Sequence, residues 1–362
     1  MTKLHTPLTF RNGVTAPNRI ALAPMTNGQS LPTGELGPVE LAWLARRVDG
    51  GFGAIITCAA YVAQDGKAWA GELGISEDAQ LPGLTELATR LRARGGLGLV
   101  QLFHGGMRAK RAHSGHQPWS ASAYQDDAPG AEVPRPATEE DLARVIEQFA
   151  AAAARAERAG FQGVELHGAH GYLLTQFLSS SMNQRSDGWG GALAGRARLL
   201  REVTRAVRAR VSAGFLVGVR LSLEDFSATK GLDLDESLEV ARQLVDDGAD
   251  YLHASLWNAD APTVKRPAEH PLTALRAALP AEIAIVTAGA IWSPAEAELA
   301  LERGADMVAL GRAAILNPDW PDEAKAAGYQ PRRPPMSAAE LEARAVSPQF
   351  IEYLRRWKDL VA

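Results

Sequence analysis

One pattern recurs along the chain: a short run rich in apolar and β-branched residues, followed by a longer stretch with helical spacing. The runs occupy residues 19–23, 53–58, 97–103, 163–167, 216–221, 250–255, 283–288 and 306–310. Apolar strands that alternate with helices are typical of a parallel sheet whose outer face is covered by helices. Eight such units predict an α/β fold, a closed (β/α)8 TIM barrel. A doubly wound open sheet is the alternative, but no G-x-G-x-x-G follows the first run.

The helical stretches carry recognisable start and stop signals. Thr138 with Asp141, and Ser293 with Glu296, have the spacing of capping boxes at helix N-termini. Glycines stand where helices give way to strands, and a glycine there fits the left-handed position that ends a helix abruptly. These glycines are Gly95, Gly160, Gly248 and Gly304.

We expect a single barrel at residues 1–329 and a C-terminal arm at residues 330–362. The proline-rich segment 330–335 marks the end of the barrel, and a helical pattern at 351–357 follows it. The arm is expected to pack on the barrel or, in a homo-oligomer, on a neighbouring subunit.

Composition limits the partners. The 362 residues carry a net charge of −4, which argues against nucleic acid or an anionic membrane surface as the main partner. No apolar run approaches the ~20 residues that span a bilayer, and the N-terminus does not have the pattern of a signal peptide, so a cytoplasmic location is expected. A single cysteine, Cys58, excludes a disulfide framework, a cysteine-rich zinc site and a thiolate-ligated iron–sulfur cluster.

The most informative motif is His167-Gly-Ala-His170-Gly-Tyr172, which follows the fourth apolar run. Imidazoles donate hydrogen bonds to an oxygen that develops negative charge, and a phenol delivers a proton. Any one of these residues alone is more simply a polar strand end. All three at this spacing indicate enzyme chemistry at the carboxyl end of a barrel strand, where the active sites of these barrels lie.

The other strand ends add polar and glycine residues to the same mouth of the barrel. Gly289, Gly311 and Arg312 follow the seventh and eighth runs, where barrels often bind phosphate. Arg220 ends an apolar run and needs a partner, either Glu224 or Asp225 or an anionic ligand. The remaining strand-end candidates are Pro24, Met25, Thr26, Ala59 and Gln101.

Several separated motifs in the same order resemble the old yellow enzyme family of FMN-dependent ene-reductases, over residues 8–318. They are N-R-I-A-L-A-P-M-T at 18–26, Q-L-F-H-G-G at 101–106, H-G-A-H-G-Y-L-L-T-Q-F-L at 167–178, N-Q-R-S-D-G-W-G-G at 183–191, A-L-G-R at 309–312 and N-P at 317–318. Some bacterial members place a tyrosine shortly after the residue that matches Thr26, whereas this chain continues Asn27-Gly28-Gln29.

The resemblance implies an FMN cofactor and the residues that hold it. Thr26 is expected to hydrogen-bond near the flavin O4, Arg220 to lie by N1 and O2, and Gly289, Gly311 and Arg312 to hold the phosphate. The residues expected to contact the isoalloxazine are Ala23, Pro24, Met25, Thr26, Ala59 and Gln101.

The resemblance also implies ping-pong catalysis. NADPH or NADH passes a hydride to flavin N5, and N5 passes it to the β-carbon of an activated alkene such as an α,β-unsaturated carbonyl or nitroalkene. His167 and His170 are expected to bind the substrate oxygen, and Tyr172 to protonate the α-carbon. Lys265 and Arg266, in the long segment 256–270, could meet a 2′-phosphate, although a solvated loop is the favoured interpretation.

Three alternatives remain. A metal-dependent barrel hydrolase could use Glu165, His167 and His170, although no metal is predicted because other strand ends offer no carboxylate ligands. A flavin-binding redox sensor without alkene turnover is the second. A phosphate-binding isomerase is weakened because no lysine marks a strand end.

Overall fold

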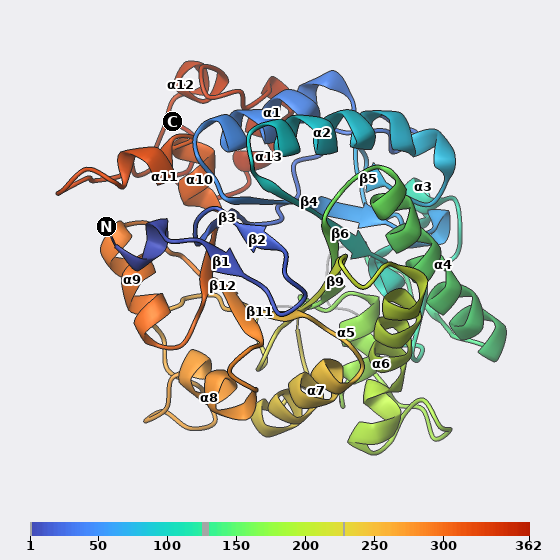
Figure 1. Ribbon diagram of the computed structural model, residues 1–362. Helices are drawn as coiled ribbons and strands as arrows, with labels where there is room; N and C mark the ends of the chain where they lie inside the picture. The colour runs from blue at the N-terminus through green and yellow to red at the C-terminus, as the bar shows by residue number, and fades with distance from the viewer. Residues whose placement is uncertain (1, 125–129, 227–228) are drawn as a thin grey trace.

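Eight parallel strands close into a barrel in the computed structural model, which describes residues 2–124, 130–226 and 229–362 (Figure 1). Each strand pairs with the next along the chain, and pairing of β13 with β3 completes the circle. The strands are β3 (Ile20–Leu22), β4 (Ala54–Tyr61), β6 (Leu97–Phe103), β9 (Gly163–Gly168), β10 (Leu216–Leu221), β11 (Tyr251–Ser255), β12 (Ala284–Ala288) and β13 (Met307–Leu310). All eight predicted strands and the TIM barrel are therefore confirmed.

The largest difference from the predicted strands is at β4. It continues to Tyr61, whereas the expected run stopped at 58, and its register with β6 shifts between Ile56 and Ala59. Ala59 therefore lies within a strand and not at its end. A short further strand, β5 (Leu73–Gly74), pairs with the carboxyl end of β4.

Helices follow the strands and surround the barrel (Figure 1). Thr138 and Ser293 form the predicted capping boxes of α4 and α9, and the four predicted stop glycines all have positive φ. The surrounding helices are α1 (Pro38–Asp49), α2 (Leu81–Ala93), α4 (Glu139–Arg158), α6 (Leu193–Arg210), α7 (Leu234–Asp246), α8 (Pro271–Ala278) and α9 (Pro294–Glu302). Shorter helices are α3 (Arg111–Ser114), α5 (Leu173–Leu178), α10 (Arg312–Leu316) and α11 (Trp320–Glu323). Over the described ranges, none of these helices is long and apolar enough to cross a membrane.

The amino end of the barrel is closed by an N-terminal hairpin of β1 (Leu8–Thr9) and β2 (Thr15–Ala16). Leu8 and Phe10 join the apolar cluster inside the barrel, and the Phe10 ring lies 5.7 Å from that of Tyr251. Strands this short carry too little periodicity to be predicted from sequence. Since this end is plugged, a ligand site is expected at the opposite end.

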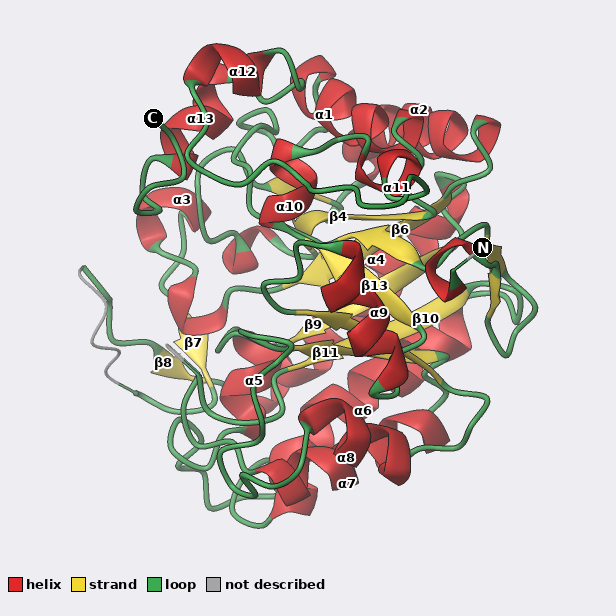
Figure 2. Cartoon of the chain, turned by 90° about the vertical axis from the view of Figure 1, so that its left-hand side faces the viewer, coloured by secondary structure: helices red, strands yellow, loops and turns green. Residues whose placement is uncertain are grey.

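The carboxyl end of the barrel is covered by later segments of the chain (Figure 2). A small parallel ribbon of β7 (Trp119–Ser120) and β8 (Arg135–Pro136) lies there, within the long segment 105–136, of which residues 125–129 fall outside the described ranges. The helices α12 (Ala338–Glu342) and α13 (Pro348–Leu354) also lie at this end.

The C-terminal segment contacts the barrel through buried side chains. Phe350 of α13 packs edge-on against Trp43 of α1, with 5.0 Å between the ring centroids. Ser347 donates a hydrogen bond of 2.6 Å to Gln29, in the segment after β3. The division into a barrel at 1–329 and an arm at 330–362 stays a prediction, but these contacts agree with an arm that packs on its own barrel.

Candidate active site

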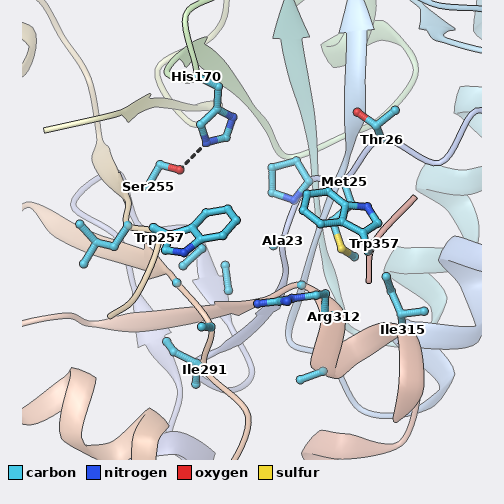
Figure 3. Close-up of a pocket in the computed structure, with 18 of the residues that line it drawn as sticks. Ala23, Met25, Thr26, His170, Ser255, Trp257, Ile291, Arg312, Ile315 and Trp357 are labelled. Atoms are coloured by element: carbon cyan, nitrogen blue, oxygen red, sulfur yellow. Dashed lines mark hydrogen bonds between the residues drawn. The ribbon is translucent and has the colours of Figure 1, made fainter. Parts of the chain in front are cut away.

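A cavity of about 490 Å³ opens at the carboxyl end of the barrel (Figure 3). Ten of the predicted site residues line it: Ala23, Pro24, Met25, Thr26, His170, Tyr172, Arg220, Gly289, Gly311 and Arg312. The other three, Ala59, Gln101 and His167, are buried and do not line it. A volume of this size is typical of a small-molecule or cofactor site.

His167, His170 and Tyr172 come together where β9 ends. The His167 ring centroid lies 5.0 Å from that of His170 and 5.1 Å from that of Tyr172, and both contacts are edge-on. The Tyr172 ring packs against Phe103 of β6 at 4.6 Å. The motif predicted from sequence is thus a compact cluster with two rings on the cavity wall.

Both histidines are neutral at physiological pH. Burial and the nearby Arg220 charge lower the pKa of His167 to about 3 and that of His170 well below its ordinary value. The His167 Nδ1 accepts a hydrogen bond from the Ala169 backbone N–H at 3.3 Å, so its proton is on Nε2. The His170 Nε2 lies 2.6 Å from the Ser255 hydroxyl (Figure 3). Each ring is therefore held by a second group and has a defined orientation.

Tyr172 keeps its proton over the whole physiological range. Burial is the main reason that the pKa of its phenol rises to about 12, although the Arg108 charge opposes the shift. A protonated phenol next to two neutral imidazoles can donate a proton to a substrate atom in the cavity.

The backbone at His170 and Gly171 has an unusual conformation. His170 has φ of 63°, a left-handed conformation that side chains other than glycine rarely adopt, and Gly171 follows with φ of 73°. The His170 backbone is held on both sides, because its N–H donates to Ser222 and its carbonyl accepts from Arg108. Such strain clusters at functional sites, and no feature of the sequence predicts it at His170.

Arg220 lines the cavity and pairs with neither of its predicted acidic partners, Glu224 and Asp225. Its side chain is buried, and its Nε makes no hydrogen bond to any described residue. Glu224 accepts instead from backbone N–H groups at Val264 and Lys265, and Asp225 from that of Leu232. Of the two alternatives set out above, the structure therefore favours the anionic ligand.

Gly289, Gly311 and Arg312 meet at the ends of β12 and β13. A Cβ at 289 would lie 2.8 Å from backbone atoms of Leu256 and Ala259, so close packing of the segment after β11 requires this glycine. Gly311 is less crowded, since the nearest atom to a Cβ there is Met25 Sδ at 3.5 Å. The cationic Arg312 side chain next to the Gly311 backbone suits a phosphate group.

A buried polar cluster lies inside the barrel and was not anticipated. Glu165 of β9 accepts hydrogen bonds from Gln101 of β6 at 2.8 Å and from Tyr251 and His253 of β11 at 3.2 and 2.8 Å. Strand alternation places residues 251, 253 and 255 on one face of β11, which was the available signal. The short run there was interpreted only as apolar.

Aromatic side chains from two segments complete the cavity. Trp257 follows β11, is 57% exposed and stacks on Phe226 with centroids 4.5 Å apart. Tyr353 and Trp357 belong to the C-terminal segment and line the cavity as well (Figure 3). Burial raises the pKa of the Tyr353 phenol, and the nearby Thr26 side chain opposes that rise. A helical pattern in an arm does not by itself indicate which face reaches a site.

The loop cations Lys265 and Arg266 are engaged by acids. Lys265 pairs with Asp233 and Asp235 at 2.7 and 2.6 Å, and Arg266 pairs with Asp235 and Glu269. These pairs agree with the favoured interpretation of a solvated loop.

The metal-hydrolase alternative loses its ligand set. Glu165 is committed to Gln101, Tyr251 and His253, and not to His167 and His170. In the ranges that the structure describes, no group of three or more His, Cys, Asp and Glu residues is arranged to hold a metal ion.

Comparison with known proteins gives consistent results. A family model described as the NADH:flavin oxidoreductase / NADH oxidase family matches residues 3–330. A probable NADH-dependent flavin oxidoreductase of Bacillus subtilis is 36% identical over 323 residues, 88% of this chain and 86% of that protein. An NADPH dehydrogenase of Bacillus licheniformis is 35% identical over 327 residues, 89% and 94% of the two chains. The solved structure of the old yellow enzyme homologue from Zymomonas mobilis superposes with a TM-score of 0.82 at 29% identity, covering 91% of this chain and 94% of that one.

Proposed function

From the premise that this chain belongs to the NADH:flavin oxidoreductase / NADH oxidase family, we propose that it is an ene-reductase for activated alkenes. It is an oxidoreductase of the old yellow enzyme type, with FMN as its cofactor and NADH or NADPH as the hydride donor. The proposal concerns the second substrate, an α,β-unsaturated carbonyl or nitroalkene, and the residues that act on it.

The cavity fits FMN. One wall is built by residues 23–26, and Arg220 offers a buried guanidinium whose Nε has no partner within the described ranges. Arg312 supplies a cation just after β13, the strand that pairs with β3, between Ile291 and Ile315 (Figure 3). We assign the isoalloxazine to the first region, with Ala59 and Gln101 behind it, and the phosphate to Gly289, Gly311 and Arg312. A flat polar ring system and an anion are the groups that these walls would bind.

The catalytic roles rest on the cluster at the end of β9. FMN, when bound, supplies two-electron hydride transfer from NAD(P)H to the β-carbon of the alkene. His167 Nε2–H and the His170 ring donate hydrogen bonds to the substrate oxygen, which gains negative charge as the hydride arrives. Tyr172 delivers a proton to the α-carbon, so that hydride and proton together saturate the double bond.

One observation carries this assignment. The neutral, oriented imidazole of His167 lies about 5 Å from the neutral imidazole of His170 and about 5 Å from the protonated phenol of Tyr172, at the cavity. The histidines can donate to an oxygen without changing their own charge, and the phenol has a proton to give. A site that only held a flavin would need none of these three groups.

An anaerobic spectral titration tests the proposal. The purified protein with FMN is reduced with NADPH or NADH until the yellow colour bleaches, and 2-cyclohexenone is then added. Recovery of the colour with formation of cyclohexanone is the expected result, and cyclohexanone added instead is the control that leaves the sample bleached. Bleaching that no enone or nitroalkene reverses would refute ene-reduction and favour the flavin redox sensor.

A further inference from the structure

The polar cluster inside the barrel has no role in the chemistry described so far. Glu165 is fully buried, and each of its two carboxylate oxygens accepts hydrogen bonds from side chains. Its partners Gln101, Tyr251 and His253 are also buried, on strands β6 and β11. Burying an acid inside a barrel is costly unless it is fully hydrogen-bonded, so the cluster calls for an explanation beyond packing.

Glu165 fixes the orientation of the Gln101 amide. Burial alone would raise the pKa of Glu165, but His253, Arg220 and the Gln101 hydrogen bond together lower it below its ordinary value. An ionised carboxylate only accepts hydrogen bonds, so Gln101 must present its NH2 group, with Nε2 2.8 Å from Glu165 Oε1. The amide oxygen of Gln101 is then directed away from Glu165, and no hydrogen bond from a described residue occupies it. Gln101 is thereby fixed as an acceptor.

The Glu165 carboxylate is also the group that most strongly stabilises the charged form of Arg220. The two residues lie on neighbouring strands, β9 and β10, and each favours the charged form of the other. No ion pair of Arg220 occurs among the described residues, so its charge is balanced through space. Burial lowers the pKa of His253 and so disfavours its charged form, although Glu165 opposes that shift.

We propose that Glu165 is a positioning residue of the cofactor site, which orients the Gln101 amide and offsets the charge of Arg220. The inference rests on the proposed placement of FMN between Arg220 and Gln101. Glu165 would then control how tightly FMN binds and how readily it is reduced. It touches neither substrate nor cofactor and acts only through its two neighbours.

The experiment measures FMN affinity and reduction potential in Glu165→Gln and Glu165→Asp. In Glu165→Gln the carboxylate charge is lost, so Arg220 favours the reduced, more negative form of FMN about tenfold more strongly. That ratio corresponds to a rise of about 30 mV for a two-electron couple. In Glu165→Asp the charge remains but the carboxylate is withdrawn from Gln101, so the potential is unchanged and FMN binds several-fold more weakly. Tyr251→Phe, which removes one donor and keeps both the charge and the Gln101 contact, is the matched control. It should leave FMN affinity within about twofold of wild type and the potential within about 9 mV.

The potential is measured by equilibration with a reference dye, without nicotinamide or alkene, so the result is independent of whether the protein reduces alkenes. An unchanged potential in folded, FMN-loaded Glu165→Gln overturns the charge argument. Wild-type FMN affinity in Glu165→Asp overturns the orientation argument. If Glu165→Gln does not fold, Glu165→Asp carries the test, since a shift of its potential would also contradict the proposal.

Discussion

Replacing Tyr172 with phenylalanine separates proton delivery from every other task of the site. The change removes only the hydroxyl group. The ring keeps its contacts with Phe103 at 4.6 Å, His167 at 5.1 Å and Trp69 at 6.4 Å. Because these contacts remain, we expect the free energy of unfolding to change by no more than about 0.5 kcal/mol.

The magnitude follows from the protonation state of Tyr172. With its pKa near 12, the phenol is a full proton donor at neutral pH, and positioned general acids contribute about 10² to 10⁴ in rate. The alkene half-reaction should therefore slow by about 100- to 10,000-fold, equivalent to roughly 3–5 kcal/mol of barrier. Reduction of FMN by NADPH requires no proton from Tyr172 and should keep its wild-type rate.

Anaerobic stopped-flow absorbance measures both half-reactions on the same preparation. Wild type and Tyr172→Phe are each reduced with NADPH, then mixed with 2-cyclohexenone, and the flavin colour is followed in both steps. Loss of the alkene step alone agrees with the proposed role. An equal loss in both steps, or a wild-type alkene step, would refute the assignment of Tyr172 as the proton donor.

Three other predictions concern protonation, orientation and packing. The alkene half-reaction should be independent of pH between about 6 and 10, because the pKa of His167 is near 3 and that of Tyr172 near 12; a rate that titrates with a pKa near 6.5 would contradict neutral histidines. Ser255→Ala removes the 2.6 Å contact to the ring of His170 and should weaken the binding of 2-cyclohexenone to the oxidised protein, measured by spectral titration, by about 3- to 10-fold; unchanged affinity would exclude an orienting role. Phe350→Ala empties a fully buried position against α1 and should lower the free energy of unfolding, measured in urea, by about 3–5 kcal/mol. If the arm instead packed on another subunit, the monomer would show no such loss of stability.

The barrel could be predicted because its strands are buried on both faces. All residues of β4, β6 and β10 are buried, so each strand is a continuous apolar run that sequence makes visible. The capping boxes of α4 and α9 and the glycines that end helices are equally local. The hairpin of β1 and β2 could not be recognised, since two-residue strands have no periodicity.

The site could be predicted only as far as strand ends locate it. The ends of β9, β10, β12 and β13 supplied His170, Arg220, Gly289 and Gly311, and all of them line the cavity. The sequence does not give the distances between residues of different segments, because these distances depend on tertiary packing. The approach of Tyr353 to Thr26 and the buried cluster around Glu165 are contacts between segments far apart in the chain. The left-handed backbone of His170 is held by Ser222 and Arg108, which are also distant in sequence.

The approach of α13 to the segment after β3 has a consequence for biosynthesis. Met25 and Thr26 are among the first residues of the cavity to be made, and Tyr353 and Trp357 are among the last. At about 5–20 residues per second, roughly 20 to 60 s separate their synthesis. Until β13 has been made, the nascent chain lacks the closing pair of β13 with β3, and it lacks Tyr353 and Trp357 for longer still. The cavity is therefore completed late in synthesis, and a premature stop codon before residue 353 would release a chain without these two aromatic side chains in its wall.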